Sequence, residues 1–331
     1  MITRKLGAAL AAGCTAVIKP PPETPFSALA LAELATRAGV PDGVINVIPT
    51  QKNVLEVGKE MCESKIVRKV TFTGSTPVAK LLYGMSASTL KKVSLEAGGN
   101  APFIVFDDAN IDEAVEGEFL LQLVIIITGL TVCSGHNLQI PWQWADNSHR
   151  ALLKKLPHSS SGMVLRRECI THGPLIHTRA VEKVTRHVDD AVSKGAQVLI
   201  GGKAIPNSSF FMPTVLSDVP ANAQINQEET FGPLASLCKF ETEDEVLQLA
   251  NDTDVGLAGY FFSRDVGRVW RVAERLEVGM VGANIGAFSQ AGIPFGGVKE
   301  SGIGREGGHG IEEYLNTKII VFGGLGLQEK A

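Results

Sequence analysis

Short apolar segments alternate with helical patterns along most of the chain, and this alternation most constrains what the chain can fold into. Residues Ile2 to Ala12 have a helical pattern, which Gly13 ends before a candidate strand from Thr15 to Lys19. Strand and helix patterns continue to alternate up to residue 117 and again after residue 171. Alternation at this short spacing is typical of βαβ units on a parallel sheet. The sequence therefore predicts an α/β fold.

Composition excludes several functional classes. The chain has 331 residues, 44% of them hydrophobic, which is ample for a buried core. Its net charge of −4 argues against a nucleic-acid partner, because such proteins normally have a basic face. The longest apolar run, Phe119 to Val132, is too short to span a bilayer, so no membrane association is expected. Five cysteines without CxxC spacing indicate neither a metal site nor disulfides, which favours a reducing, cytoplasmic location.

Glycine turns offer two candidate anion sites. The GxGxxG pattern of Gly302, Gly304 and Gly307 follows a polar, glycine-rich stretch instead of a strand, so we interpret it as a cluster of turns. The turn at Gly74 and Ser75 follows an apolar strand pattern and precedes a helix, where backbone amides and a hydroxyl suit an anion. An ordinary helix N-cap explains the serine equally well.

Two acidic positions are candidates for chemistry. Glu96 follows a predicted strand and precedes two glycines, where α/β enzymes place reactive groups, although a solvated loop carboxylate is the simpler interpretation of that residue alone. Glu228 and Glu229 precede Phe231 in QEETFGP, and composition alone favours a charged turn. Three histidines are predicted to be surface or cap residues, not ligands; they are His172, His177 and His187.

Six separated segments together carry a specific resemblance. In chain order they are IKPPPETPFSALALAELATRAGVPDGVINVI, VTFTGST, VSLEAGGNAPFIVFDDANIDEAV, EETFGPL, ANDTDVGLAGYFFS and PFGGVKESGIGREGG. Over residues 1–117 and 170–325 the chain resembles the NAD(P)-dependent aldehyde dehydrogenase superfamily. The resemblance implies the C-terminal part of a Rossmann-type cofactor domain at residues 1–98. It further implies an α/β catalytic domain at residues 99–300 and a tail at residues 301–331 with an oligomerisation strand.

The resemblance assigns cofactor roles to matching positions. Lys19 would contact the adenosine ribose or its phosphate. Gly74 and Ser75 would form the turn on the pyrophosphate. Glu229 would hold the nicotinamide ribose, with Phe231 beside it. The implied cofactor is NAD or NADP; the choice stays open because a proline stands where many NAD-preferring members have a ribose-binding glutamate.

The resemblance also implies a reaction. Glu96 would be the general base that activates the deacylating water, and Ser289 would help to bind a distal carboxylate of the substrate. Members that oxidise succinate semialdehyde to succinate, a step of GABA catabolism, are most similar. Two alternatives stay open: an inactive remnant that binds nucleotide or a full-length homologue, and an aldehyde dehydrogenase of other specificity. The residues from Tyr314 to Phe322 would assemble a homo-oligomer.

Residues 118–170 depart from the family pattern. The family's nucleophilic cysteine would fall at Leu130, and the nearby Cys133 lacks the Gly-Gln-x-Cys context, so it is a candidate nucleophile in an unusual setting. The family's asparagine of the oxyanion hole would precede Met1, so we expect an N-terminal truncation, and a mitochondrial leader could have been lost with it. The sharp edges of the departing segment suggest a reading-frame error or a retained intron.

The frame hypothesis predicts what the cell makes. Peptide mass spectra of the endogenous protein should contain a Gly-Gln-x-Cys peptide between the flanks of residues 118–170, because a frame error replaces the whole segment at once. A peptide that contains WQWADNSH joined to those flanks would contradict the hypothesis.

Overall fold

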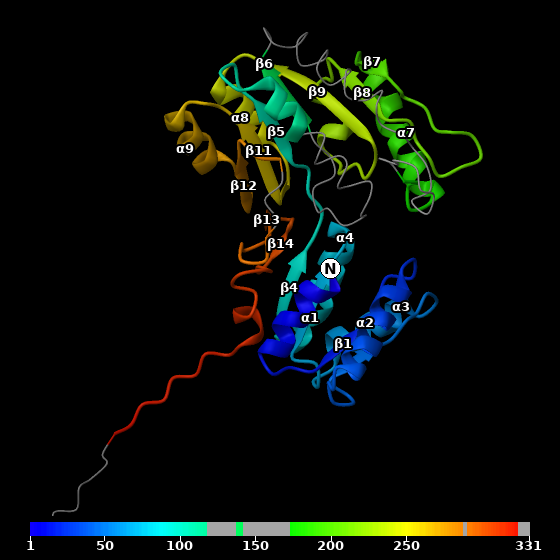
Figure 1. Ribbon diagram of the computed structural model, residues 1–331, viewed down its shortest axis with the longest axis vertical. Helices are drawn as coiled ribbons and strands as arrows, with labels where there is room; N and C mark the ends of the chain where they lie inside the picture. Colours follow the sequence, from blue (N-terminus) through cyan, green and yellow to red (C-terminus); the bar gives the residue numbers. More distant parts are fainter. Residues whose placement is uncertain (118–136, 142–172, 287–289, 324–331) are drawn as a thin grey trace, which may run out of the picture.

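The computed structural model describes residues 1–117, 137–141, 173–286 and 290–323. Figure 1 shows the N-terminal elements at the lower end of the molecule and a larger sheet, built by later residues, at the upper end. The chain passes between the two ends directly after residue 96 and returns near residue 297, so the polypeptide crosses the junction at least twice.

The N-terminal group alternates helix and strand as the sequence predicts. β1 and β2 form a parallel pair, and β3 and β4 form another in which Thr73 lies opposite Glu96. Gly13 has φ of +77°, a conformation that costs a glycine little, so it ends the first helix as predicted. The elements are α1 (Ile2–Ala11), β1 (Ala16–Ile18), α2 (Pro25–Arg37), β2 (Ile45–Val47), α3 (Val54–Glu63), β3 (Lys69–Thr73), α4 (Thr76–Ser86) and β4 (Lys92–Glu96).

The larger sheet has seven strands in the order β12-β11-β5-β6-β9-β8-β7. Every neighbouring pair is parallel except β7 with β8. This confirms the predicted α/β class. The strands are β5 (Pro102–Val105), β6 (Asn137–Pro141), β7 (Gln197–Ile200), β8 (Thr214–Ser217), β9 (Leu234–Phe240), β11 (Ala258–Phe262) and β12 (Met280–Ala283).

Helices cover both faces of this sheet: the helical residues 111–117 cover one face with Ala114 and Val115, and three later helices cover the other. Along β5 the side chains alternate: Phe103 and Val105 belong to one apolar cluster, while Ile104 belongs to another with residues of α8 (Glu243–Asn251) and α9 (Val266–Arg275). α7 (Thr178–Ser193) packs its apolar stripe against β8 and β9. A parallel sheet that is covered on both faces has nearly continuous apolar strands, and all four residues of β5 are buried.

A short return segment joins the two ends of the molecule. β13 (Val298–Lys299) pairs with β10 (Val255–Gly256), and β14 (Gly302–Ile303) pairs with β4. Gly302 lies opposite Glu96 with φ of +143°, and an added Cβ would lie 1.9 Å from the carbonyl oxygen of Leu95. Gly304 and Gly307 also have positive φ. The interpretation of this glycine pattern as turns therefore fits Gly304 and Gly307, which lie at bends, whereas Gly302 belongs to β14.

β6 adds to the sequence analysis, which predicted no strand at residues 137–141 in the segment that departs from the family pattern. Its five residues lie between β5 and β9 and pair in parallel with both, so they form the central strand of the sheet. The rest of that segment lies outside the described residues.

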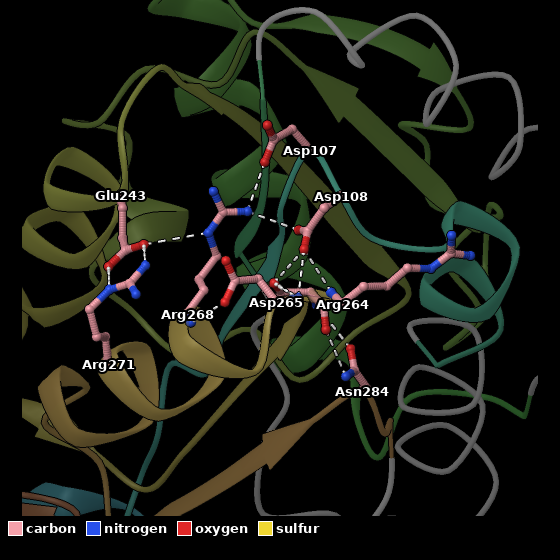
Figure 2. A network of polar contacts seen from close by, with 9 residues as sticks. Asp107, Asp108, Glu243, Arg264, Asp265, Arg268, Arg271 and Asn284 are labelled. Atoms are coloured by element: carbon pink, nitrogen blue, oxygen red, sulfur yellow. Dashed lines mark hydrogen bonds and ion pairs between the residues drawn. The ribbon is translucent and has the colours of Figure 1, made fainter.

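One arginine organises the ends of the strands on the α9 side. Arg268 of α9 donates from Nη1 to Asp107 and Asp108, at 2.8 Å in each case, just after β5 (Figure 2). Its Nε lies 3.4 Å from a carboxylate oxygen of Glu243, and its guanidinium lies 4.8 Å from the ring centroid of Phe106. The cation therefore joins β5, α8 and α9.

The same network fixes the chain after β11. Oδ2 of Asp108 accepts hydrogen bonds at 2.8 Å from the Ser263 hydroxyl and from the amides of Arg264 and Asp265. Although burial opposes it, these donors hold the pKa of Asp108 below its usual value. Asn284 exchanges two hydrogen bonds with the backbone of Ser263, so the ends of β11 and β12 are held together.

The tail has no strand pairing within the described chain. Residues 315–323 extend away from the rest of the molecule (Figure 1). Its apolar side chains lie in solvent; Ile319 and Val321 are 85% and 86% exposed. The predicted oligomerisation strand from Tyr314 to Phe322 stays a prediction, because its pairing would need a second chain. Among the described residues, no helix has the length and apolarity needed to cross a membrane.

Arg268→Ala should lower the free energy of unfolding by about 1–2 kcal/mol, because it leaves Asp107 and Asp108 side by side without the cation that they share, while Glu243 keeps its pair with Arg271. Arg275→Ala is the matched control: it breaks a more exposed pair with Asp244 and should cost less than about 0.5 kcal/mol. Urea unfolding of both variants checks this. Equal small losses would contradict the organising role of Arg268.

Candidate active site

The turn after β3 is attached to the end of β4. The amide of Gly74 donates to the carbonyl oxygen of Glu96 at 3.0 Å, and an added Cβ at Gly74 would lie 2.4 Å from the ring of Phe72. Ser75 is the N-cap residue of α4, yet its hydroxyl makes no capping hydrogen bond and the residue is exposed. The hydroxyl stays available beside the first amides of α4, which favours the anion interpretation over an ordinary cap.

Glu96 is buried at the last position of β4. It is 2% exposed, so the interpretation of this residue as a solvated loop carboxylate is wrong. Burial raises the pKa of Glu96 from an ordinary 4.5 to about 7. Its Oε2 has no hydrogen-bond partner among the described residues. A carboxyl group of this kind is partly ionised near neutral pH and can accept a proton from water.

Cations surround this carboxyl group, and the sequence analysis named none of them. The charges of Lys5 and Arg305 lower the pKa of Glu96 and so partly offset the effect of burial. Lys5 is itself paired with Glu306, and burial lowers the pKa of Lys5 to about 8. Nη1 of Arg305 donates to the carbonyl oxygens of Gly297 and Gly304, at 2.8 and 2.9 Å. The return segment therefore carries a fixed positive charge towards Glu96.

The two glycines after Glu96 bring a second carboxyl group close. The amide of Gly99 donates to Oε1 of Glu229 at 3.2 Å, and the amide of Gly98 donates to the Thr76 hydroxyl at the same distance. A Cβ at Gly98 would lie 3.1 Å from that hydroxyl and 3.2 Å from Oε2 of Glu229. Burial raises the pKa of Glu229 to about 8. The turn after β3, the segment after β4 and the QEETFGP loop therefore meet at one place.

Of the remaining predicted site residues, Phe231 lies close to Glu229 in the sequence, Lys19 lies on another sheet, and two are outside the described residues. Phe231, two residues after Glu229, is 45% exposed and offers an open aromatic face beside the carboxyl group. Lys19 directly follows β1, on the smaller two-stranded sheet. Cys133 and Ser289 lie outside the described residues, so their predicted roles stay predictions.

The histidine predictions had mixed outcomes. His177 is the N-cap of α7, where its Nδ1 accepts from the amide of Ala180 at 3.0 Å, so the cap prediction is confirmed. His187 is fully buried and contacts Glu228 and Thr230, so the prediction of a surface or cap residue is wrong. The helical spacing could have shown this, because position 187 continues the apolar stripe of α7. His172 lies outside the described residues.

Comparisons with known proteins agree with this geometry. The model of the aldehyde dehydrogenase family matches residues 1–320, a range that includes residues 118–170, where the motif resemblance stops. The chain is 52% identical to the mitochondrial succinate-semialdehyde dehydrogenase of Hylobates lar over 98% of this chain and 61% of that protein. It is 50% identical to the glutarate-semialdehyde dehydrogenase of Pseudomonas aeruginosa over 98% of this chain and 67% of that protein.

A solved structure gives the same result for the fold. The crystal structure of an E. coli NADP dependent enzyme superposes with a TM-score of 0.92 at 51% identity and covers 95% of this chain and 65% of that chain. The fold implied by the six motifs is therefore confirmed. The chain spans about 61% of the length of its mitochondrial relatives.

The raised pKa of Glu96 predicts a pH-dependent effect on stability. A carboxyl group whose pKa rises from 4.5 to about 7 on folding contributes stability below pH 4.5 that is lost progressively as pH rises to about 7. As pH rises across this range, the free energy of unfolding of Glu96→Gln should therefore increase relative to that of the wild type, by up to about 3 kcal/mol. Urea unfolding of both proteins at several pH values between 4.5 and 8 measures the difference. A constant difference would contradict the prediction.

Proposed function

The chain belongs to the aldehyde dehydrogenase family, and from that premise we propose that it oxidises an aldehyde to a carboxylic acid with NAD or NADP, with succinate semialdehyde as the substrate. The observation that supports this most directly is the carboxyl group of Glu96. It is buried at a strand end, has a pKa of about 7, and its buried Oε2 has no hydrogen-bond partner in the described part of the chain. These are the properties of a general base that activates water.

The surrounding residues fit a nicotinamide dinucleotide. The Gly74–Ser75 turn opens α4 with an unbonded hydroxyl, which suits a pyrophosphate. Glu229 accepts a hydrogen bond from the Gly99 amide, and its carboxyl group lies next to Gly98. A side chain at position 98 would crowd this carboxyl group. We assign the nicotinamide ribose to Glu229, with Phe231 beside it, and the adenosine ribose or its phosphate to Lys19. When bound, the cofactor supplies the acceptor for the substrate's hydride.

The chain's own groups would carry the remaining chemistry. We propose Cys133 as the nucleophile: its thiolate adds to the aldehyde carbon, and after the hydride leaves, an acyl thioester remains. Glu96 accepts a proton from the water that attacks this thioester, and the carboxylic acid and the thiol are released. Lys5 and Arg305 keep part of the Glu96 population ionised against the cost of burial.

The choice of substrate follows the relatives. Two of them are named for succinate and glutarate semialdehydes, which both carry an aldehyde at one end and a carboxylate at the other. We propose that Ser289 contacts this carboxylate. An aldehyde of other chemistry is the alternative, which a substrate panel would distinguish. The similar structure from E. coli is that of an NADP dependent enzyme, which favours NADP, but no described residue of this chain distinguishes NADP from NAD.

A second candidate function is nucleotide binding without turnover. It is favoured by the absence of a Gly-Gln-x-Cys motif from the sequence. In that case the exposed residues of the tail would join this chain to a full-length homologue, whereas an active enzyme would use them in a homo-oligomer. We propose a cytoplasmic location, with the mitochondrion, named for the relatives, as the alternative.

The purified chain should form NADH or NADPH from succinate semialdehyde, and Glu96→Gln should lower turnover by about a hundred-fold or more. Glu33→Gln, on an exposed face of α2, is the control and should match the wild type. Calorimetric titration with NAD and NADP accompanies the assay. Binding without turnover would favour the second candidate, and neither binding nor turnover would contradict both.

A further inference from the structure

The QEETFGP loop lies on α7 through a buried histidine. His187 is fully buried; its Nδ1 lies 2.6 Å from the Thr230 hydroxyl and its Nε2 lies 3.2 Å from Oε2 of Glu228. Arg186, on the exposed side, also contacts Glu228 at 3.2 Å. The proposed function assigns no role to His187 or to these contacts between α7 and the loop.

The contacts alternate along the loop. Glu228 and Thr230 face α7, while Glu229 between them faces the opposite way and accepts from the Gly99 amide. Successive side chains of an extended segment point to opposite sides. The contacts of Glu228 and Thr230 with α7 therefore fix the direction in which the side chain of Glu229 points.

The backbone also approaches α7 closely at this point. An added Cβ at Gly232 would lie 2.4 Å from Val184, one helical turn before His187. The loop therefore has little room to shift on the helix. Val184 supplies apolar contact, and Asp190 accepts a hydrogen bond from the amide of Gln224, at the start of this region. His187 is the fully buried residue of α7 that contacts both Glu228 and Thr230, the two neighbours of Glu229.

The chemistry of the histidine suits a permanent contact. A carboxylate only accepts hydrogen bonds, so Nε2 of His187 donates to Glu228, and Nδ1 of the neutral ring accepts from the Thr230 hydroxyl. Burial lowers the pKa of His187, which keeps the ring neutral near neutral pH. Both ring nitrogens are thus satisfied, as a buried polar side chain requires.

We propose that His187 is a positioning residue for cofactor binding: it holds Glu228 and Thr230 against α7 and thereby fixes Glu229 on the Gly99 amide. The inference rests on the proposed role of Glu229 at the nicotinamide ribose. A purely structural role for His187 would support the core of α7 without affecting Gly99, which is on the far side of the loop.

Four variants separate these roles. His187→Ala removes both hydrogen bonds. His187→Asn places an amide near Nδ1 and keeps a partner for Thr230, and His187→Gln reaches towards the Nε2 position and keeps a donor for Glu228. Thr185→Ala is the matched control, because the Thr185 hydroxyl bonds only within α7, to the carbonyl oxygen of Val181.

Hydrogen–deuterium exchange tests the inference without any cofactor. In His187→Ala, the amide of Gly99 and residues 228–234 should exchange about ten-fold faster than in the wild type, while Thr185→Ala should leave Gly99 unchanged. The Asn or Gln variant should restore part of the protection. If Gly99 exchanges at the wild-type rate in His187→Ala, or if Thr185→Ala accelerates it equally, the inference is overturned.

Calorimetric titration with NAD and NADP adds the functional readout. His187→Ala should bind about ten-fold more weakly and the better of the Asn and Gln variants should recover, whereas unchanged affinity in His187→Ala would overturn the inference. A wild type that binds neither dinucleotide would contradict the proposed function instead. The exchange experiment would then still decide whether His187 positions Glu229.

Discussion

The arrangement of the site depends on the hydrogen bonds that hold the backbone directly after β4. From Glu96 to Gly99 the backbone is held from several directions. Its amides donate to the carbonyl oxygen of Ser301, to the Thr76 hydroxyl and to Glu229, and the Ser301 hydroxyl donates back to the carbonyl oxygen of Gly98. Each partner comes from a different part of the sequence. This short segment therefore joins the N-terminal strands, the return segment and the QEETFGP loop before the chain enters β5. Because residues 98 and 99 are glycines, the partners can approach the backbone itself.

Two carboxyl groups are removed from solvent beside this segment, and different partners offset the cost of desolvating each one. Glu96 has Lys5 and Arg305 nearby, which partly offset desolvation, and its pKa is about 7. Glu229 has mainly a backbone amide, and its pKa is about 8. Desolvating a carboxylate without a fully compensating partner costs stability, so neither position serves the fold. Perturbed carboxyl groups that converge with glycines at a strand end are a mark of functional sites, which is why the geometry and the family assignment support each other.

Much of this could be predicted from the sequence, and the failures have physical causes. The strand and helix order, the stop at Gly13 and the turns around Gly302 follow from local backbone chemistry, so residue patterns were sufficient. The burial of Glu96 was missed by composition because it depends on β14, which is paired to β4 from more than 200 residues away. The cations at that carboxyl group come from α1 and from the return segment, and no local pattern joins them. β6 was missed because its five residues pair on both sides with strands that are distant in the sequence, β5 and β9, and no local pattern marks that pairing.

His187 shows how a buried polar residue can connect the core with the site. α7 packs its apolar stripe under β8 and β9, so its position is set by the core. One polar residue in that stripe is tolerated only because both ring nitrogens find partners, and both partners belong to the loop that carries Glu229. Contacts with α7, whose own position is set by the core, thus fix a loop that has no regular secondary structure. A hydrocarbon at position 187 would serve the stripe equally well but would remove the buried contacts to Glu228 and Thr230, on either side of Glu229. The polar choice at a buried helical position is therefore explained by the site, not by the core.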